Sequence, residues 1–473
     1  MQFSEREIQD FIWDTRDNWH ELIDEIEYPA LFSFEGKDGP EGVNAESLLH
    51  NYLVSKISDI HAQVKHLLLI GVEVPLGKPG TSKIRADFLA TQEGDTGIFI
   101  IELKKSKQTE REAFTELLAY ANHLNYLFPS HCVDDTVFVL IAPVETRTVE
   151  AAFLQSLLFD RKQVCILQPY LTQDSDLASL RLKPFMPRPD DMQLFFNAAF
   201  SKRNFDVEVV VWSKVPDFWN PEGRDPDGYV KKQMNRLAGT VAQSMEAKNI
   251  HGFVYCQQSW PELQDVVYAY PNKLVMVALN PYKIANDYYY LTTYPGVPHD
   301  EIPNINDWSE DAINLTDIIP GLKNRRSILA HEDWNYFSGL ASVWGSHLGR
   351  IGRKAVEFAN LNCLQKHVHI EVANGGTWDV YEVNSIENIY TFNYEVRTTG
   401  LLRELYTETT KLDFAYWSTY HKHPYQGDCF GWALDNAESH ELFEVFLNRM
   451  FHNATTEDDE NDGGDDGFDN NTY

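Results

Sequence analysis

Three ionisable residues on two apolar segments carry the strongest chemical signal in this sequence. Asp87 lies within IRADFLA, and Glu102 and Lys104 lie within IFIIELKKS. Both segments are otherwise strongly apolar, which is typical of buried strands. Side chains alternate along a strand, so Glu102 and Lys104 should project from the same face. If the two segments pair as neighbouring strands, Asp87 lies beside these two residues.

Two carboxylates and one ammonium in a partly buried place predict a site for a divalent cation. Unpaired charges are costly to bury, and a cation neutralises the carboxylates. Magnesium prefers oxygen ligands and commonly takes only one or two carboxylates from the protein. The residues alone leave a simpler alternative open. In that alternative Glu102 and Lys104 form an ion pair on an edge strand, and Asp87 is a carboxylate beside a turn.

The segments around these residues alternate between helical and strand periods. Apolar spacing predicts helices over 4–27, 45–69, 109–127 and 147–160, and strands over 72–76, 83–91, 97–105, 136–142 and 164–169. This order predicts an α/β fold with a mixed sheet between helices. The strand GIFII should be central and buried on both faces.

A second α/β domain should follow a break in LKPFMPRPDD, where three prolines interrupt every period. Its apolar pattern predicts strands over 207–212, 251–256, 273–279, 366–373 and 377–384, and helices over 229–248, 321–361, 399–410 and 437–451. The last nineteen residues hold eight acids and no Lys or Arg, so they should be disordered. The predicted organisation is a first domain over 1–181, a linker over 182–194, a second domain over 195–454 and an acidic tail over 455–473.

The pattern D-x14-E-x-K, formed by Asp87, Glu102 and Lys104 within an α-β-β-β-α order, resembles the PD-(D/E)xK nuclease superfamily over residues 44–170. The resemblance implies a restriction-endonuclease-like mixed sheet flanked by helices. It also implies that Asp87, Glu102 and the helix residue Glu46 bind Mg²⁺, with Mn²⁺ as a substitute, and that Lys104 assists the attacking water. Ala86 stands where the name of the motif has proline.

Further residues acquire expected roles from this resemblance or from their charge. The helix after the ExK strand often carries a Glu and a Tyr near the site, which Glu116 and Tyr120 resemble at positions i and i+4. Lys104 between two carboxylates should stay protonated and stabilise charge on the phosphate rather than act as a base. Basic side chains flank the motif and either contact substrate phosphates or form a solvated face: Lys83, Arg85, Lys105, Lys107 and Arg111.

Composition excludes several classes of protein. The chain has 473 residues, 43% of them hydrophobic, and a formal net charge of −31. So acidic a protein does not coat nucleic acid through non-specific charge, and phosphate chemistry would need a local basic patch or bound cations. Five widely spaced cysteines, an acidic amino end and the lack of a long apolar run predict reduced thiols, no membrane span and a cytoplasmic location.

Three functions agree with these observations. The first is a magnesium-dependent endonuclease, expected to cut DNA, in which residues 195–454 recognise a partner or form a homo-oligomer. The superfamily resemblance alone associates such chains with restriction or phage defence. The second is a non-catalytic nucleic-acid-binding or sensor protein with a nuclease-like fold. The third is a protein-interaction factor whose acidic tail imitates nucleic acid.

Overall fold

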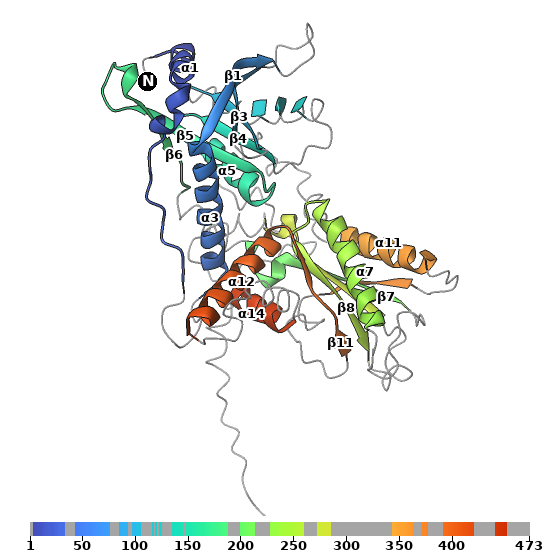
Figure 1. The fold of residues 1–473 in the computed structure, drawn as a ribbon. Coiled ribbons are helices and arrows are strands. Elements are labelled where there is room, and N and C mark those ends of the chain that lie inside the picture. The colour runs from blue at the N-terminus through green and yellow to red at the C-terminus, as the bar shows by residue number, and fades with distance from the viewer. Residues whose placement is uncertain are drawn as a thin grey trace, which may run out of the picture. The chain divides into compact units, whose positions relative to one another are not determined.

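The chain divides into two compact units. The first comprises Met1–Leu31 and His50–Pro189, and the second comprises Phe32–Leu49 and Asp190–Tyr473. The computed structural model describes residues 3–33, 43–75, 85–92, 97–105, 116–117, 119–120, 123–124, 135–144, 147–187, 199–212, 228–259, 272–284, 343–362, 370–376, 391–420 and 440–451. Each unit combines a sheet with helices (Figure 1), which confirms the predicted α/β class.

The sheet of the first unit is mixed. Its spatial order follows the chain through β1 (Leu67–Pro75), β2 (Arg85–Gln92), β3 (Ile98–Leu103), β4 (Thr136–Ile141), β5 (Gln163–Leu171) and β6 (Leu180–Pro184). Strands β3, β4 and β5 run parallel, and the other neighbours are antiparallel. Almost every residue of β3 and β4 is buried, which is the pattern of strands covered on both faces.

Helices of the first unit pack their apolar faces on this sheet. They are α1 (Glu5–Asp14), α2 (Trp19–Leu22), α5 (Arg147–Leu158) and the part of α3 (Ala45–Lys65) from His50 onward. Helix α1 begins at a capping box, in which Ser4 Oγ accepts from the Glu7 N–H and the Glu7 carboxylate accepts from the Ser4 N–H. Trp19 Nε1 donates to the Val64 carbonyl at 2.7 Å. These contacts fix the amino end of the chain against the core.

The structure differs from the sequence prediction where α3 ends. The helix stops at Lys65, and Leu67 already belongs to β1, whereas the periodicity predicted a helix to Leu69. Pairing with β2 supplies backbone hydrogen bonds from Leu67 onward. Along the start of β1, burial alternates with period two, which is the strand pattern. Strand β6 likewise occupies the start of the predicted linker, because it pairs with β5.

The second unit holds an antiparallel sheet between helices. Its strands are β7 (Phe205–Trp212), β8 (Gly252–Ser259), β9 (Asn272–Leu279), β10 (Ile370–Gly376), β11 (Thr391–Asn393) and β12 (Arg397–Thr399), and its helices are α7 (Tyr229–Glu246), α11 (Ser346–Asn362), α12 (Leu401–Tyr420) and α14 (His440–Phe451). Helices α7 and α11 share a core with Val254 of β8. Phe253 precedes Val254 on β8, so its side chain lies on the other face of the sheet. It packs on Phe443 of α14 with ring centroids 4.8 Å apart. The two sets of helices therefore cover opposite faces.

Several sequence predictions for the second unit fall on residues that are not described. They are the predicted strand over 377–384, most of the predicted helix over 321–361, and the acidic tail over 455–473. In the described part of the chain, no helix combines the length and the apolar character needed to cross a membrane.

Candidate functional site

Asp87 lies on β2, beside the end of β3. The two strands pair in antiparallel register with Phe88 opposite Ile101. This register brings the Asp87 carboxylate to the Leu103 backbone, and Asp87 Oδ2 accepts a hydrogen bond from the Leu103 N–H at 2.7 Å. The bond fixes one carboxylate oxygen at the edge of the two strands.

Glu102 and Lys104 project from the same face of the chain at the end of β3. Lys104 Nζ lies 2.6 Å from Glu102 Oε1 and 2.6 Å from Glu116 Oε2. The Glu102 side chain is only 3% exposed and that of Lys104 is 12% exposed, so water screens these charges weakly. The ammonium group is therefore held between two carboxylates.

Burial raises the pKa of both strand carboxyls. For Asp87, desolvation raises the pKa, and the Leu103 N–H and the Lys104 charge offset it only in part. For Glu102, desolvation again raises the pKa, and the charge of Asp87 adds to it. Burial opposes the protonation of Lys104, but its contacts with Glu102 and Glu116 raise the pKa above the ordinary lysine value. The two strand carboxylates thus repel each other in a poorly hydrated place, and a divalent cation would relieve this repulsion.

Glu116 and Tyr120 lie one turn apart in a helical segment after β3. Glu116 reaches Lys104, as described above. Tyr120 is buried, and desolvation together with the charges of Glu102 and Glu116 raises the pKa of its hydroxyl. The hydroxyl therefore stays protonated and can donate a hydrogen bond near the carboxylates.

The carboxylate oxygens of Asp87 and Glu102 are ligands of the kind that magnesium and manganese prefer. Glu102 Oε2 is buried and has no hydrogen-bond partner among the described residues. Such an oxygen carries a desolvation penalty that a hard cation would offset. No group of three or more His, Cys, Asp or Glu side chains is arranged to hold a metal ion in the residues that the structure describes. The fit therefore rests on two carboxylates, which is a usual protein contribution for magnesium.

Glu46, the third acid of the predicted metal set, lies in the first turn of α3. That turn belongs to the second unit, whereas Asp87 and Glu102 belong to the first. Metal binding by Glu46 stays a prediction.

The predicted substrate-binding residues are distributed around the cluster. Arg85 begins β2 and lies 3.7 Å from Glu73 at an exposed position. Lys105 follows β3 and is half-buried. Lys83, Lys107 and Arg111 lie outside the described residues. Substrate binding by these five residues stays a prediction.

Two residues of α1, Gln9 and Glu5, contact the cluster or the backbone next to it, and neither was among the predicted site residues. Gln9 Nε2 donates to the Asp87 carbonyl at 3.3 Å and to Asp87 Oδ1 at 3.4 Å. Glu5 Oε1 accepts from the Lys105 backbone N–H at 2.9 Å. Gln9 is buried, although its neighbours on the apolar face of α1 are isoleucines. A buried glutamine on an apolar helix face was the only available signal, because it must find a polar partner.

Comparison of this chain with family models, with curated proteins and with solved structures finds no match.

Proposed function

We propose that this protein is a metal-dependent endonuclease that hydrolyses phosphodiester bonds, with DNA as the expected substrate. One observation carries the proposal. A half-buried carboxylate, Asp87, and a buried one, Glu102, lie on neighbouring strands beside Lys104, and Glu102 Oε2 has no hydrogen-bond partner among the described residues. The PD-(D/E)xK resemblance and a restriction-endonuclease-like fold are parts of the same proposal, as is a role in restriction or phage defence.

The residues of the cluster have different proposed roles. Asp87 and Glu102 would hold Mg²⁺ or Mn²⁺, which supplies Lewis-acid polarisation of the phosphate and a lowered pKa for a water molecule. Lys104 keeps its proton because Glu102 and Glu116 surround it, so it contributes positive charge toward the phosphate rather than basicity. Tyr120 supplies a hydroxyl donor in the same place.

A second function has one specific observation in its favour. Lys104 already forms close ion pairs with Glu102 and Glu116, and these pairs compensate part of the buried charge without any metal. A protein that keeps this network for stability alone would be a non-catalytic nucleic-acid-binding or sensor protein. The two functions share the fold, and they differ in whether a divalent cation binds at the cluster around Lys104.

Incubation of the purified full chain with plasmid DNA, RNA and Mg²⁺ or Mn²⁺ tests the proposal. We expect cleavage by the wild type and none by Asp87→Asn or Lys104→Gln. The matched control is Asp160→Asn, which removes one carboxylate from a surface ion pair with Lys162 in the same unit. If wild type, control and variants all leave both nucleic acids intact with either metal, the endonuclease function is rejected in favour of the sensor function.

A further inference from the structure

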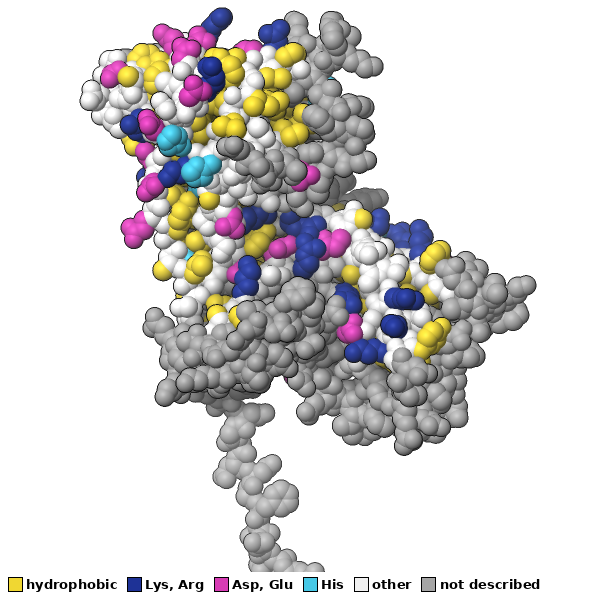
Figure 2. Space-filling view, in the orientation of Figure 1, with side chains coloured by type: hydrophobic (Ala, Val, Ile, Leu, Met, Phe, Trp, Pro, Cys, Tyr) yellow, Lys and Arg dark blue, Asp and Glu magenta, His cyan; other side chains and the backbone are white. Residues whose placement is uncertain are grey.

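A long groove crosses the surface of the second unit between α7, β12 and α12. Its volume is about 1290 Å³, and its lining residues, most of them polar, come from α7, α12 and the segment 395–398 that leads into β12. Figure 2 shows Lys and Arg side chains over the surface of these helices, with fewer acidic ones among them. We call it the α7–α12 groove. All of its lining residues belong to one compact unit.

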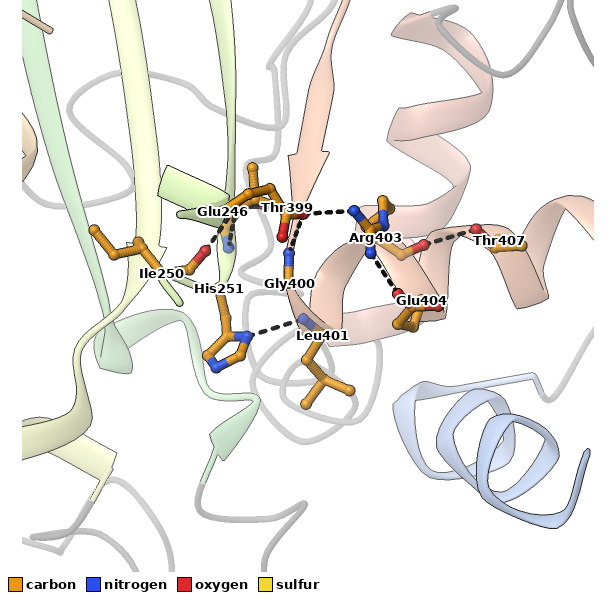
Figure 3. A network of polar contacts seen from close by, with 10 residues as sticks. Glu246, Ile250, His251, Thr399, Gly400, Leu401, Arg403, Glu404 and Thr407 are labelled. Carbon is orange, nitrogen blue, oxygen red and sulfur yellow. Dashed lines mark hydrogen bonds and ion pairs between the residues drawn. The ribbon is translucent and has the colours of Figure 1, made fainter. Parts of the chain in front are cut away.

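Hydrogen bonds hold the walls of the α7–α12 groove in place (Figure 3). The Leu401 N–H, at the start of α12, donates to His251 Nδ1 at 2.9 Å. Thr399 Oγ1 donates to the Ile250 carbonyl at 2.8 Å. Between them, Gly400 has a φ of 60° and packs so closely on His251 that a Cβ atom would collide with the imidazole. The groove is therefore a preformed feature of the fold.

Positive charge dominates the groove, although the whole chain is strongly acidic. Four cationic residues line it, against two acids, Glu246 and Glu395. The cations are Lys232, Arg236, Arg397 and Arg403. Each acid is already engaged, because Glu246 lies 2.8 Å from Arg403 and Glu395 lies 2.9 Å from Arg397. The excess positive charge thus comes from Lys232 and Arg236.

Lys232 and Arg236 stand one turn apart on the exposed face of α7. No ion pair joins either of them to an acid among the described residues. Asn235, between them, uses its side-chain oxygen to accept from the Glu395 N–H, which leaves its amide N–H groups as donors. Gln243 adds a second exposed amide two turns further on. Unpaired cations with amide donors are the groups that contact phosphate oxygens.

Other lining groups argue against recognition of particular bases. Thr240, Thr407 and Thr410 donate their hydroxyl protons to carbonyls of their own helices. The ring of Tyr406 packs on Phe443 and Phe446, so it is not available as a stacking platform. Binding here would therefore depend on phosphate charge and be insensitive to sequence.

We propose that the α7–α12 groove binds the phosphodiester backbone of a single-stranded nucleic acid. A concave surface with cations along one wall can track one strand, whereas duplex recognition uses elements that protrude into the DNA grooves. The inference rests on the proposed nuclease function for its choice of polyanion, since it assigns a place where a substrate strand is held outside the Asp87 cluster.

Fluorescence anisotropy with a labelled oligothymidylate, in EDTA so that no cleavage occurs, tests the inference on the full chain. The double variant Lys232→Ala/Arg236→Ala should bind about tenfold more weakly at low salt, and the slope of log binding constant against log salt should fall by about 1.4. The matched control is Lys248→Ala/Lys354→Ala, which removes two exposed cations of the same unit outside the groove. Circular dichroism establishes that both variants are folded.

Three results would overturn the inference. They are no binding by the wild type, equal losses in the groove variant and the control, and equal competition by polyglutamate, which would indicate an acidic protein ligand. Cleavage with Mg²⁺ is measured separately on the same variants. Cleavage without groove-dependent binding would reject the groove and leave the nuclease function standing. Groove-dependent binding without cleavage by the wild type would support the groove and reject the nuclease function.

Discussion

Each unit of the molecule contains two carboxylates and a lysine beside a central part of its sheet, and the two clusters differ in how their oxygens are used. In the second unit, Asp206 and Glu208 lie two residues apart on β7. Lys283 Nζ donates to Asp206 Oδ1 at 2.6 Å, and Asn280 Nδ2 donates to Asp206 Oδ2 at 2.8 Å. Both oxygens of this aspartate are therefore satisfied by side chains.

The second cluster is also approached closely by the backbone at Gly345. Gly345, just before α11, approaches so near that a Cβ atom there would lie 2.7 Å from Glu208 Oε1. In the first unit, by contrast, Glu102 Oε2 is buried and has no partner among the described residues. By residue type alone, the two clusters would be equally good candidates for a cation site. This buried oxygen without a hydrogen-bond partner makes the first cluster the better candidate for a cation site.

The variant with the greatest predicted loss of activity removes a carboxylate from the first cluster, and its counterpart removes a carboxylate from the second. Asp87→Asn should lower the rate of metal-dependent cleavage about 1000-fold, because it removes a carboxylate that the proposed cation needs. Asp206→Asn should leave that rate within about threefold of the wild type. Initial rates of plasmid nicking measure both. Similar losses in the two variants would show that the clusters are not functionally different.

The next prediction concerns the free energy of unfolding, and here the larger effect is expected from a change in the second cluster. Lys283→Met should lower the free energy of unfolding by about 2 kcal/mol, because it leaves the poorly exposed Asp206 carboxylate without its cation. Lys162→Met, from the more exposed pair with Asp160, should cost less than about 1 kcal/mol. Urea unfolding measures both values, and cleavage should survive Lys283→Met. A stable but inactive Lys283→Met protein would contradict a purely structural second cluster.

A smaller effect tests the sign of the carboxyl pKa shifts. Burial raises the pKa of Glu102 above its ordinary value of 4.5, so the folded protein prefers the protonated carboxyl. This favourable contribution is present at low pH and is lost as the pH rises through the raised pKa. Glu102→Gln should therefore stabilise the protein by about 1 kcal/mol at pH 8 and have little effect near pH 4.

Glu208 in the second cluster provides a comparison for the pH dependence of stability that is expected from Glu102. Burial, with the charge of Asp206, raises the pKa of Glu208 to about 7, so Glu208→Gln should also stabilise the protein at pH 8. Thermal unfolding with and without Mg²⁺ separates the two sites. Magnesium should stabilise the wild type and the Glu208→Gln variant, but not the Glu102→Gln variant. A magnesium effect that persists in Glu102→Gln would place the cation elsewhere.

The smallest effect concerns α1. Gln9→Leu removes two long hydrogen bonds to Asp87 and should reduce metal-dependent cleavage about threefold, through a less well-oriented carboxylate. Because the role is one of positioning, the loss should shrink at saturating Mg²⁺. Gln155→Leu, at an exposed position on α5, is the control. An equal loss at every magnesium concentration would argue that Gln9 only stabilises the fold.

Local sequence patterns were sufficient to predict the features that depend on neighbouring residues. Side-chain alternation placed Glu102 and Lys104 on one face, and the structure shows them in contact. Runs of apolar residues predicted the buried strands β3 and β4, and helical spacing predicted α7 and α14 near their observed positions. These features follow from local periodicity, which a single chain displays directly.

The contacts between groups from distant parts of the chain could not be predicted from such patterns. The register of β2 on β3 brings the Asp87 carboxylate to the Leu103 N–H, and the packing of α1 brings Gln9 to Asp87 across 78 residues of sequence. The α7–α12 groove likewise joins residues from three separate elements. Such encounters depend on how buried faces pack and on which polar groups are left to pair. The spacing of residues along the chain indicates neither the packing of buried faces nor the pairing of polar groups.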